Sequence, residues 1–116
     1  RKLWFNPALR LYAPEFIVSE FLKYSATLRR KSGLEKKDFE KLLELTLSQL
    51  HLVDDNSLRP FIPAAKFLVN DPKDWLYAAC ALSNDAAIWS NDKKLKDQNQ
   101  IKVYNTHELS KISGHH

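Results

Sequence analysis

Apolar and polar positions along the chain follow two different spacings, and together they predict strands interleaved with helices. Short apolar runs are typical of strands, whereas apolar positions that recur every three to four residues are typical of amphipathic helices. The short runs predict strands at 9–13, 50–53, 86–90 and 101–104. The helical spacing predicts helices at 14–30, 35–50, 57–69, 71–83, 93–97 and 106–112. Strands that alternate with helices indicate an α/β domain built on a parallel sheet.

Breaking and capping residues support these boundaries. Pro14 stops the first strand and suits the first turn of the helix that follows, and Gly33 is expected to end that helix. Pro60 and Pro63 are expected to interrupt the helix at 57–69, and Thr106 is expected to cap the last helix. There are no repeats or linkers, so we expect a single domain over residues 1–112.

Composition narrows the class of protein. With 116 residues and 44% hydrophobic content, the chain is long enough for one domain with one core. Eighteen Lys and Arg against fourteen Asp and Glu leave a net charge of +4, which weakly favours a polyanionic partner. No run of about eighteen apolar residues is present to span a membrane. The single Cys80 fits a reducing, cytoplasmic location. We interpret residues 113–116 as the remnant of a purification tag.

Acidic residues are expected to gather at one edge of the sheet. Asp92 directly follows the strand at 86–90, and the carboxyl ends of parallel strands are where functional groups collect. Asp74 opens the helix at 71–83. Both have an equally simple structural interpretation, since Asp92 can cap the next helix, and Asp71 with Asp74 can form a capped helix start.

Glu20 is harder to explain as a surface residue. It shares a helical face with Phe16, Ile17 and Tyr24, so its charge lies near the inward face, where an unpaired carboxylate is costly. Carboxylates that face one another raise each other's pKa values and destabilise the fold unless a cation lies between them. A ligand set made only of carboxylate oxygens selects Mg²⁺ or Mn²⁺ over zinc.

Four stretches of the chain, taken in order, resemble one family. They are residues 12–20, residues 71–74 with 78–82, residues 88–92 and residues 102–109. Over residues 11–109 their order and spacing resemble the PIN-domain nucleases, especially the toxin ribonucleases of bacterial and archaeal toxin–antitoxin pairs.

The resemblance implies a fold, an activity and a set of site residues. The fold would be a three-layer α/β/α arrangement with a parallel sheet of four or five strands. The activity would be hydrolysis of RNA phosphodiester bonds by a Mg²⁺- or Mn²⁺-dependent endoribonuclease, with an antitoxin protein as partner. The implied roles are catalysis and metal binding for Glu20, Asp74 and Asp92, support for Asn91 and Asp71, and binding of substrate phosphates for Lys93 and Lys94. The alternative for these lysines, with Lys96, is a solvated helix face.

The chain departs from the family pattern at its start. PIN domains begin with a central strand that ends in an Asp, and this chain begins after that strand, with residues 1–5 in the tail of the first helix. The departure predicts that the chain alone has impaired activity, and it keeps open a second function, a non-catalytic RNA-binding or protein-interaction module. It also leaves the strands near Tyr12 and Ile88 without a partner between them. We therefore expect a bound peptide, a homodimer or a strand-exchanged oligomer to fill the gap.

Other reactive or charged residues are expected to have structural roles. We expect Cys80 to be a buried, inert thiol and His51 and His107 to bind no metal. Trp75, Tyr77 and Trp89 are expected in the core, with base stacking by Trp75 as the alternative. The basic run Arg29–Lys31, with Lys36 and Lys37, is expected to be a solvated turn.

Overall fold

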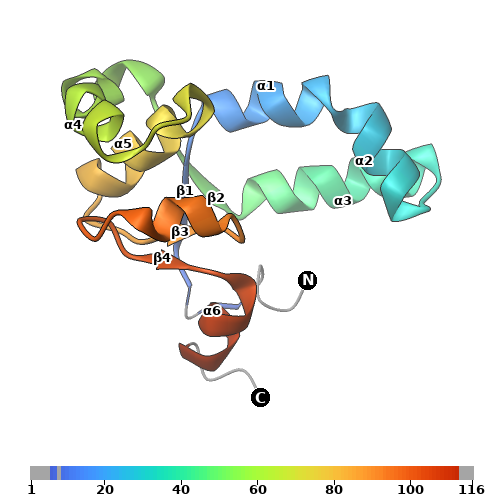
Figure 1. Ribbon diagram of the computed structural model, residues 1–116. Helices are drawn as coiled ribbons and strands as arrows, with labels where there is room; N and C mark the ends of the chain where they lie inside the picture. Colours follow the sequence, from blue (N-terminus) through green and yellow to red (C-terminus); the bar gives the residue numbers. More distant parts are fainter. Residues whose placement is uncertain (1–5, 8, 113–116) are drawn as a thin grey trace.

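The computed structural model describes residues 6, 7 and 9–112 (Figure 1). Residues 1–5, where the tail of a helix was expected, and residues 113–116, the expected tag remnant, lie outside the described residues. The α-helices are α1 (Phe16–Lys23), α2 (Ser25–Ser32), α3 (Lys36–Ser48), α4 (Ile62–Leu68), α5 (Trp75–Ser83) and α6 (Thr106–Ile112). The strands are β1 (Leu11–Pro14), β2 (Leu50–Val53), β3 (Ile88–Trp89) and β4 (Val103–Tyr104). Three 3-10 helices are η1 (Asp55–Phe61), η2 (Pro72–Asp74) and η3 (Lys93–Asp97).

The strands form two parallel pairs. β1 pairs with β2 in the register Leu11 with Leu50 through Pro14 with Val53, and β3 pairs with β4 in the register Ile88 with Val103. The α/β class and the parallel direction are as predicted. The predicted single sheet of four or five strands is not what the described residues show, because β1 and β3 are not paired and two two-stranded sheets result.

An open groove separates the two sheets. Residues 10–14 line one side and residues 86–91 line the other, with Tyr77, Cys80 and Ala81 of α5 contributing to the lining, and the groove has a volume of about 380 Å³. Backbone groups of a strand alternate in direction, and the N–H of Glu15 donates to the Val53 carbonyl at 2.9 Å. The N–H and C=O of Tyr12 therefore face away from β2, toward the groove. On the other side, the Ile88 N–H donates to the carbonyl of Lys102, directly before β4, at 2.9 Å, and the Ser90 N–H donates to the carbonyl of Tyr104 in β4 at 3.0 Å.

The core surrounds α5. Ala78 and Ala79 of this helix are fully buried, and so are Leu58 of η1 and Ala65 of α4. Small side chains let the helix backbones approach closely, and Val69, Leu95, Ile101 and Val103 complete the same apolar cluster. The core thus fixes α5, and with it the turn at Asp71–Asp74 that precedes this helix.

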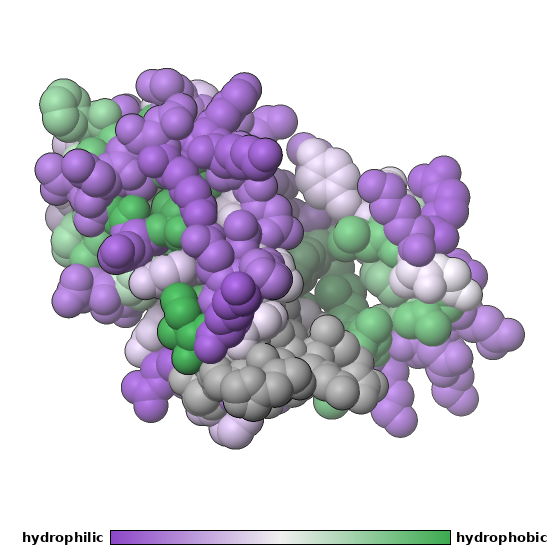
Figure 2. All heavy atoms as spheres, turned by 60° about the horizontal axis from the view of Figure 1, so that its bottom comes forward, coloured by the Kyte–Doolittle hydropathy of each residue, from purple (hydrophilic) through white to green (hydrophobic). Residues whose placement is uncertain are grey.

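Helices α1, α2 and α3 form an arm that extends from this core (Figure 1). Phe39 is their only buried residue. Figure 2 shows hydrophilic side chains on the outside of the arm and hydrophobic ones between its helices. The single helix predicted at 14–30 is wrong, because the chain breaks at Tyr24, where φ is −103° and ψ is 11°. The Ser25 hydroxyl donates to the Leu22 carbonyl at 3.0 Å, a bond that competes with regular helix pairing.

Several boundaries follow the predicted breakers. Gly33 ends α2 with φ of 72°, and its N–H donates to the Arg29 carbonyl at 3.2 Å. The helix predicted at 57–69 is a 3-10 helix containing Pro60, followed by α4, and the one predicted at 71–83 begins as η2. The short helix at 93–97 is also 3-10. No helix of the described residues is both long and apolar enough to cross a membrane.

The predicted cap of the last helix is wrong by one residue. Asn105, not Thr106, caps α6, because the Glu108 N–H donates to Asn105 Oδ1 at 2.8 Å. The Asn105 N–H donates in return to Glu108 Oε1 at 2.9 Å, which completes a capping box. Thr106 instead accepts a hydrogen bond from Trp89 Nε1 at 3.0 Å, which ties β3 to α6.

Candidate acidic site

Tyr77 marks the place where acids from separate elements gather. Burial raises the pKa of the Tyr77 phenol, and the charges of Glu20, Asp74 and Asp55 raise it further, in that order. These acids come from α1, from the turn before α5, and from the start of η1. The Phe16 ring packs edge-on against Tyr77, with ring centroids 6.4 Å apart. Three carboxylates thus lie within electrostatic range of one half-buried phenol.

Asp74 links this group to the other sheet. Burial raises the pKa of Asp74, the charges of Asp71 and Asp92 raise it further, and Lys73 lowers it. Asp92 follows β3, so its effect on Asp74 places the two acids within electrostatic range of each other although they belong to different elements. The charge of Glu20 acts on Tyr77, and the charge of Asp92 acts on Asp74. Because Asp74 and Tyr77 both lie at the start of α5, Glu20 and Asp92 are each in electrostatic range of this part of the chain.

The capping interpretation is confirmed for two of the acids. Asp71 caps η2, where its Oδ1 accepts a hydrogen bond from the Lys73 N–H at 3.0 Å, and Asp92 caps η3 by accepting from the Lys94 N–H at 3.0 Å. Asp74 makes no such side-chain cap bond, although it stands at the start of α5. The cap bond uses one carboxylate oxygen of Asp92 and leaves the second oxygen for another contact. Capping is therefore compatible with a second role for Asp92.

Asp55 is the acid that the sequence reading missed. Its Oδ1 accepts a hydrogen bond from the Phe16 N–H at 3.3 Å, which joins the start of η1 to the start of α1. A signal was available in the sequence, since Asp54 and Asp55 directly follow the strand at 50–53. The rule that singled out Asp92 after its strand applies equally to Asp55.

The residues next to Asp92 hold its loop in place. Asn91 Oδ1 accepts a hydrogen bond from the Thr106 N–H at 3.0 Å, and Ser90 Oγ accepts one from the Asp92 N–H at 3.1 Å. Lys93 and Lys94 are exposed beside Asp92, whereas Lys96 forms an ion pair with Glu108. Asn91 therefore fixes the loop between β3 and η3.

The side chains of the site offer the ligand atoms that a hard divalent cation prefers, but among the described residues they do not form a compact metal-binding group. Glu20, Asp55, Asp74 and Asp92 offer only carboxylate oxygens, which are the ligands that Mg²⁺ and Mn²⁺ prefer. Burial raises the pKa of Asp74 most, and the charges of Asp71 and Asp92 raise it further; a bound cation would offset this repulsion between charges. Within residues 6, 7 and 9–112, however, no three His, Cys, Asp or Glu side chains are close enough together to hold a metal ion.

Other candidate residues have structural roles. Burial raises the pKa of the Cys80 thiol to about 11, so the thiol stays protonated near neutral pH, as expected for an inert cysteine. Trp75 is partly buried, and its Nε1 donates to the Val69 carbonyl at 2.8 Å, which favours the predicted core role over base stacking. His51 and His107 are exposed, and neither belongs to a metal-ligand group of the described residues.

Comparison with known proteins identifies the family. The family model of the PIN domain matches residues 1–110, and the chain therefore belongs to the PIN-domain family. PIN domains are generally nucleases, and they usually use divalent metal ions. No curated protein and no solved structure matches the chain.

Proposed function

We propose that this protein is a Mg²⁺- or Mn²⁺-dependent endoribonuclease and acts as the toxin of a toxin–antitoxin pair in the cytoplasm. The observation that carries the proposal is the gathering of Glu20, Asp55 and Asp74 around Tyr77, with Asp92 in electrostatic range of Asp74. Glu20, Asp55 and Asp74 are partly buried, and carboxylates in electrostatic range of one another are less stable unless a cation lies between them.

Each residue has a defined part in this proposal. Asp74, Asp92 and Glu20 would hold the ion, and Asp55 would support them from the start of η1. A bound divalent ion supplies an activated water and neutralises charge on the scissile phosphate. Asp71 and Asn91 keep the two acidic loops in position through their hydrogen bonds to Lys73 and Thr106. Lys93 and Lys94 would attract substrate phosphates beside Asp92.

The groove between β1 and β3 supports the proposal about partners. We propose that residues 1–112 form one PIN-like domain, and that a strand from a second copy pairs with β1 in the groove. The N–H and C=O of Tyr12 face this groove, and a strand that pairs with β1 would bond to both groups. Size in solution and intact mass test this. A dimer supports strand exchange, an added peptide mass shows another occupant, and a folded monomer of 13.5 kDa contradicts the proposal.

Cleavage of a labelled single-stranded RNA, with and without Mg²⁺ or Mn²⁺, tests the enzymatic proposal. Asp74→Asn is expected to abolish cleavage, because Asp74 makes no cap bond that would give it another role. Asp85→Asn is the matched control, since Asp85 is exposed and lies away from the acids named above. The backbone of Asp85 has φ of 49°, a conformation that Asn tolerates well. Equal cleavage by the parent and Asp74→Asn would contradict the proposed site.

A second candidate function is a non-catalytic RNA-binding or protein-interaction module. It is favoured because, among the described residues, no three side chains that could bind a metal ion lie close enough together to hold one. RNA binding by the parent without any metal-dependent cleavage would support this module over the ribonuclease.

A further inference from the structure

The end of the helical arm concentrates the positive charge of the protein. Residues 29–37 contain five cations and one acid, Glu35, for a net charge of +4. The whole chain also has a net charge of +4, so its other residues sum to zero. The five cations, which we call the basic tip, are Arg29, Arg30, Lys31, Lys36 and Lys37.

The basic tip is exposed and unneutralised. All residues from 26 to 38 are exposed to solvent. Within the part of the chain that the structure describes, the basic tip forms no ion pair, and the one ion pair joins Lys96 to Glu108. The single side-chain hydrogen bond from the tip is weak, from Arg30 Nη2 to Thr27 Oγ1 at 3.5 Å. These cations are therefore available to an external anion.

The turn at Gly33 brings the cations of two helices together. Arg29, Arg30 and Lys31 lie in the last turn of α2, where positive charge is favourable to the helix dipole. Lys36 and Lys37 lie in the first turn of α3, where the dipole makes positive charge unfavourable. Asp38 lies in the same first turn and Glu35 is at the N-cap position, so these acids offset part of that cost.

We infer that the basic tip binds RNA phosphates outside the acidic site, so that the arm holds the RNA chain and the acids act on it; this inference rests on the proposed ribonuclease function. The acids named above repel phosphates when no cation is bound, so attraction must come from cations outside them, and the basic tip would add to the attraction by Lys93 and Lys94. Helix α1 carries Glu20 and is followed, after the break at Tyr24, by α2, and each of these helices of 8 residues is about 12 Å long. An RNA chain held at Arg30 can therefore reach the acidic site.

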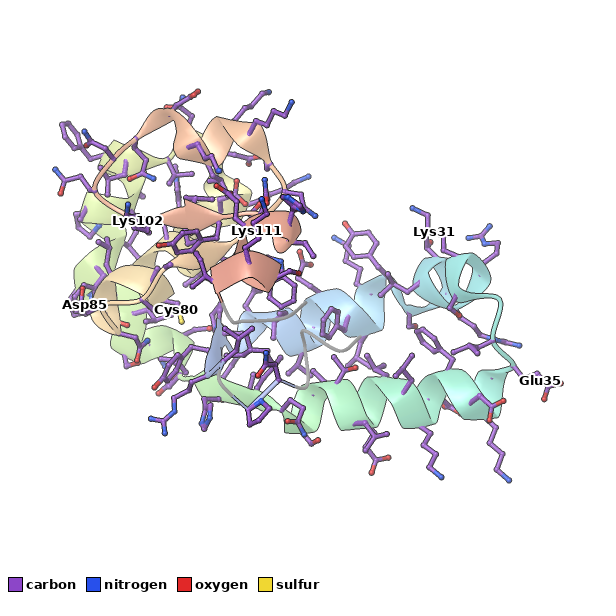
Figure 3. All side chains as sticks on the ribbon, turned by 90° about the horizontal axis from the view of Figure 1, so that it is seen from below. Lys31, Glu35, Cys80, Asp85, Lys102 and Lys111 are labelled. Carbon is purple, nitrogen blue, oxygen red and sulfur yellow. The ribbon has the colours of Figure 1, made fainter. Side chains whose placement is uncertain are left out.

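The test compares matched charge changes at two ends of the molecule. Figure 3 shows Lys31 and Glu35 at the end of the arm, and Lys102 and Lys111 on the opposite part of the protein. Lys36→Gln/Lys37→Gln removes two charges from the basic tip, and Lys102→Gln/Lys111→Gln removes two charges elsewhere. All four lysines are exposed. Removing Lys36 and Lys37 relieves the unfavourable dipole interaction, so weaker RNA binding by this variant would not come from unfolding.

Binding is measured by fluorescence anisotropy with a labelled 20-nucleotide single-stranded RNA in EDTA, over a series of KCl concentrations. The tip variant is expected to bind roughly ten- to thirtyfold more weakly at 0.1 M salt, and the slope of log K against log salt should fall by about 1.4. Arg30→Gln/Lys31→Gln should behave likewise. The Lys102→Gln/Lys111→Gln control should bind within about twofold of the parent.

Parent-like binding by both tip variants, or an equal loss in the control, would overturn the inference. Displacement of RNA by polyglutamate at equal charge would also overturn the inference, because the basic tip would then be a binding site for an acidic protein. Failure of the ribonuclease proposal is separate. RNA binding that depends on the tip without cleavage in Mg²⁺ or Mn²⁺ would leave the inference standing, whereas cleavage without that dependence would refute the inference alone.

Discussion

Replacing Asp92 in two ways separates its capping role from a role as a ligand. In the structure, Asp92 Oδ1 accepts a hydrogen bond from the Lys94 N–H at 3.0 Å and so caps η3. Asp92→Asn keeps an oxygen at this position and removes the charge. Asp92→Ala removes both the oxygen and the charge.

The two variants should differ in stability and agree in activity. Loss of an N-cap costs about 1 kcal/mol, which corresponds to a fall in Tm of about 3–6 °C for a domain of this size. Asp92→Ala should show this fall, and Asp92→Asn should melt within about 2 °C of the parent. Both should abolish metal-dependent RNA cleavage, because both remove a charged ligand from the proposed site.

Thermal unfolding followed by circular dichroism gives the stabilities, and cleavage of labelled RNA in Mg²⁺ gives the activities. If Asp92→Asn cleaves RNA at the parent rate, Asp92 is only a cap and the reasoning is refuted. If both variants melt at the same reduced temperature, the charge rather than the hydrogen bond stabilises η3, and the capping argument fails.

Three further predictions concern groups whose surroundings the structure defines. Because the pKa of Asp74 is raised, its charged form lowers stability above that pKa, and the penalty is lost as pH falls through it toward 3.8. Asp74→Asn should therefore unfold at a higher temperature than the parent at pH 7. The difference between the two melting temperatures should shrink at lower pH. Cys80, buried and with a pKa raised to about 11, should react with a thiol reagent at pH 8 far more slowly than the denatured chain does, and equal rates would contradict its placement. Asn105→Ala should cost about 1 kcal/mol in chemical denaturation because it removes the cap of α6. Thr106→Ser keeps both that cap and the hydroxyl that accepts from Trp89, so it should cost less, and the reverse order would show that the capping box is misassigned.

Local signals in the sequence predicted much of the fold. The strand at 50–53 and the last helix at 106–112 were predicted with the bounds that the structure has. Gly33 ends α2 because a left-handed residue was needed there. In contrast, apolar spacing continues through Phe21, Leu22 and Tyr24, so the break at Tyr24 was not visible in the pattern. The Ser25 hydroxyl bonds to a backbone carbonyl at this break, and such bonds leave no trace in periodicity.

The arrangement of the strands could not be read from the sequence in the same way. Each strand was recognisable, but pairing depends on contacts between distant residues. The structure pairs β1 with β2 and β3 with β4 and leaves the groove between β1 and β3. The resemblance to PIN domains pointed to this region near Tyr12 and Ile88, whereas spacing alone did not.

The candidate site was predicted only in part, because its residues also meet through contacts between distant parts of the chain. Asp92 stood out because it directly follows a strand, and Asp74 because it opens the helix at 71–83; the structure places them in electrostatic range of each other. Asp55 was passed over as part of a turn. Its proximity to Tyr77 comes from the packing of η1 against α1 and α5, which no local pattern encodes.

Binding of Mn²⁺ to the protein tests the central claim most directly, and it can be measured by electron paramagnetic resonance of the free ion during titration. The account predicts that the parent and Asp85→Asn bind one or two Mn²⁺ ions, and that Mg²⁺ competes for them. Asp74→Asn and Asp92→Asn should each lose this binding while remaining folded. Binding of Mn²⁺ that is unchanged in both acidic-site variants, or absent from the folded parent, would contradict the account.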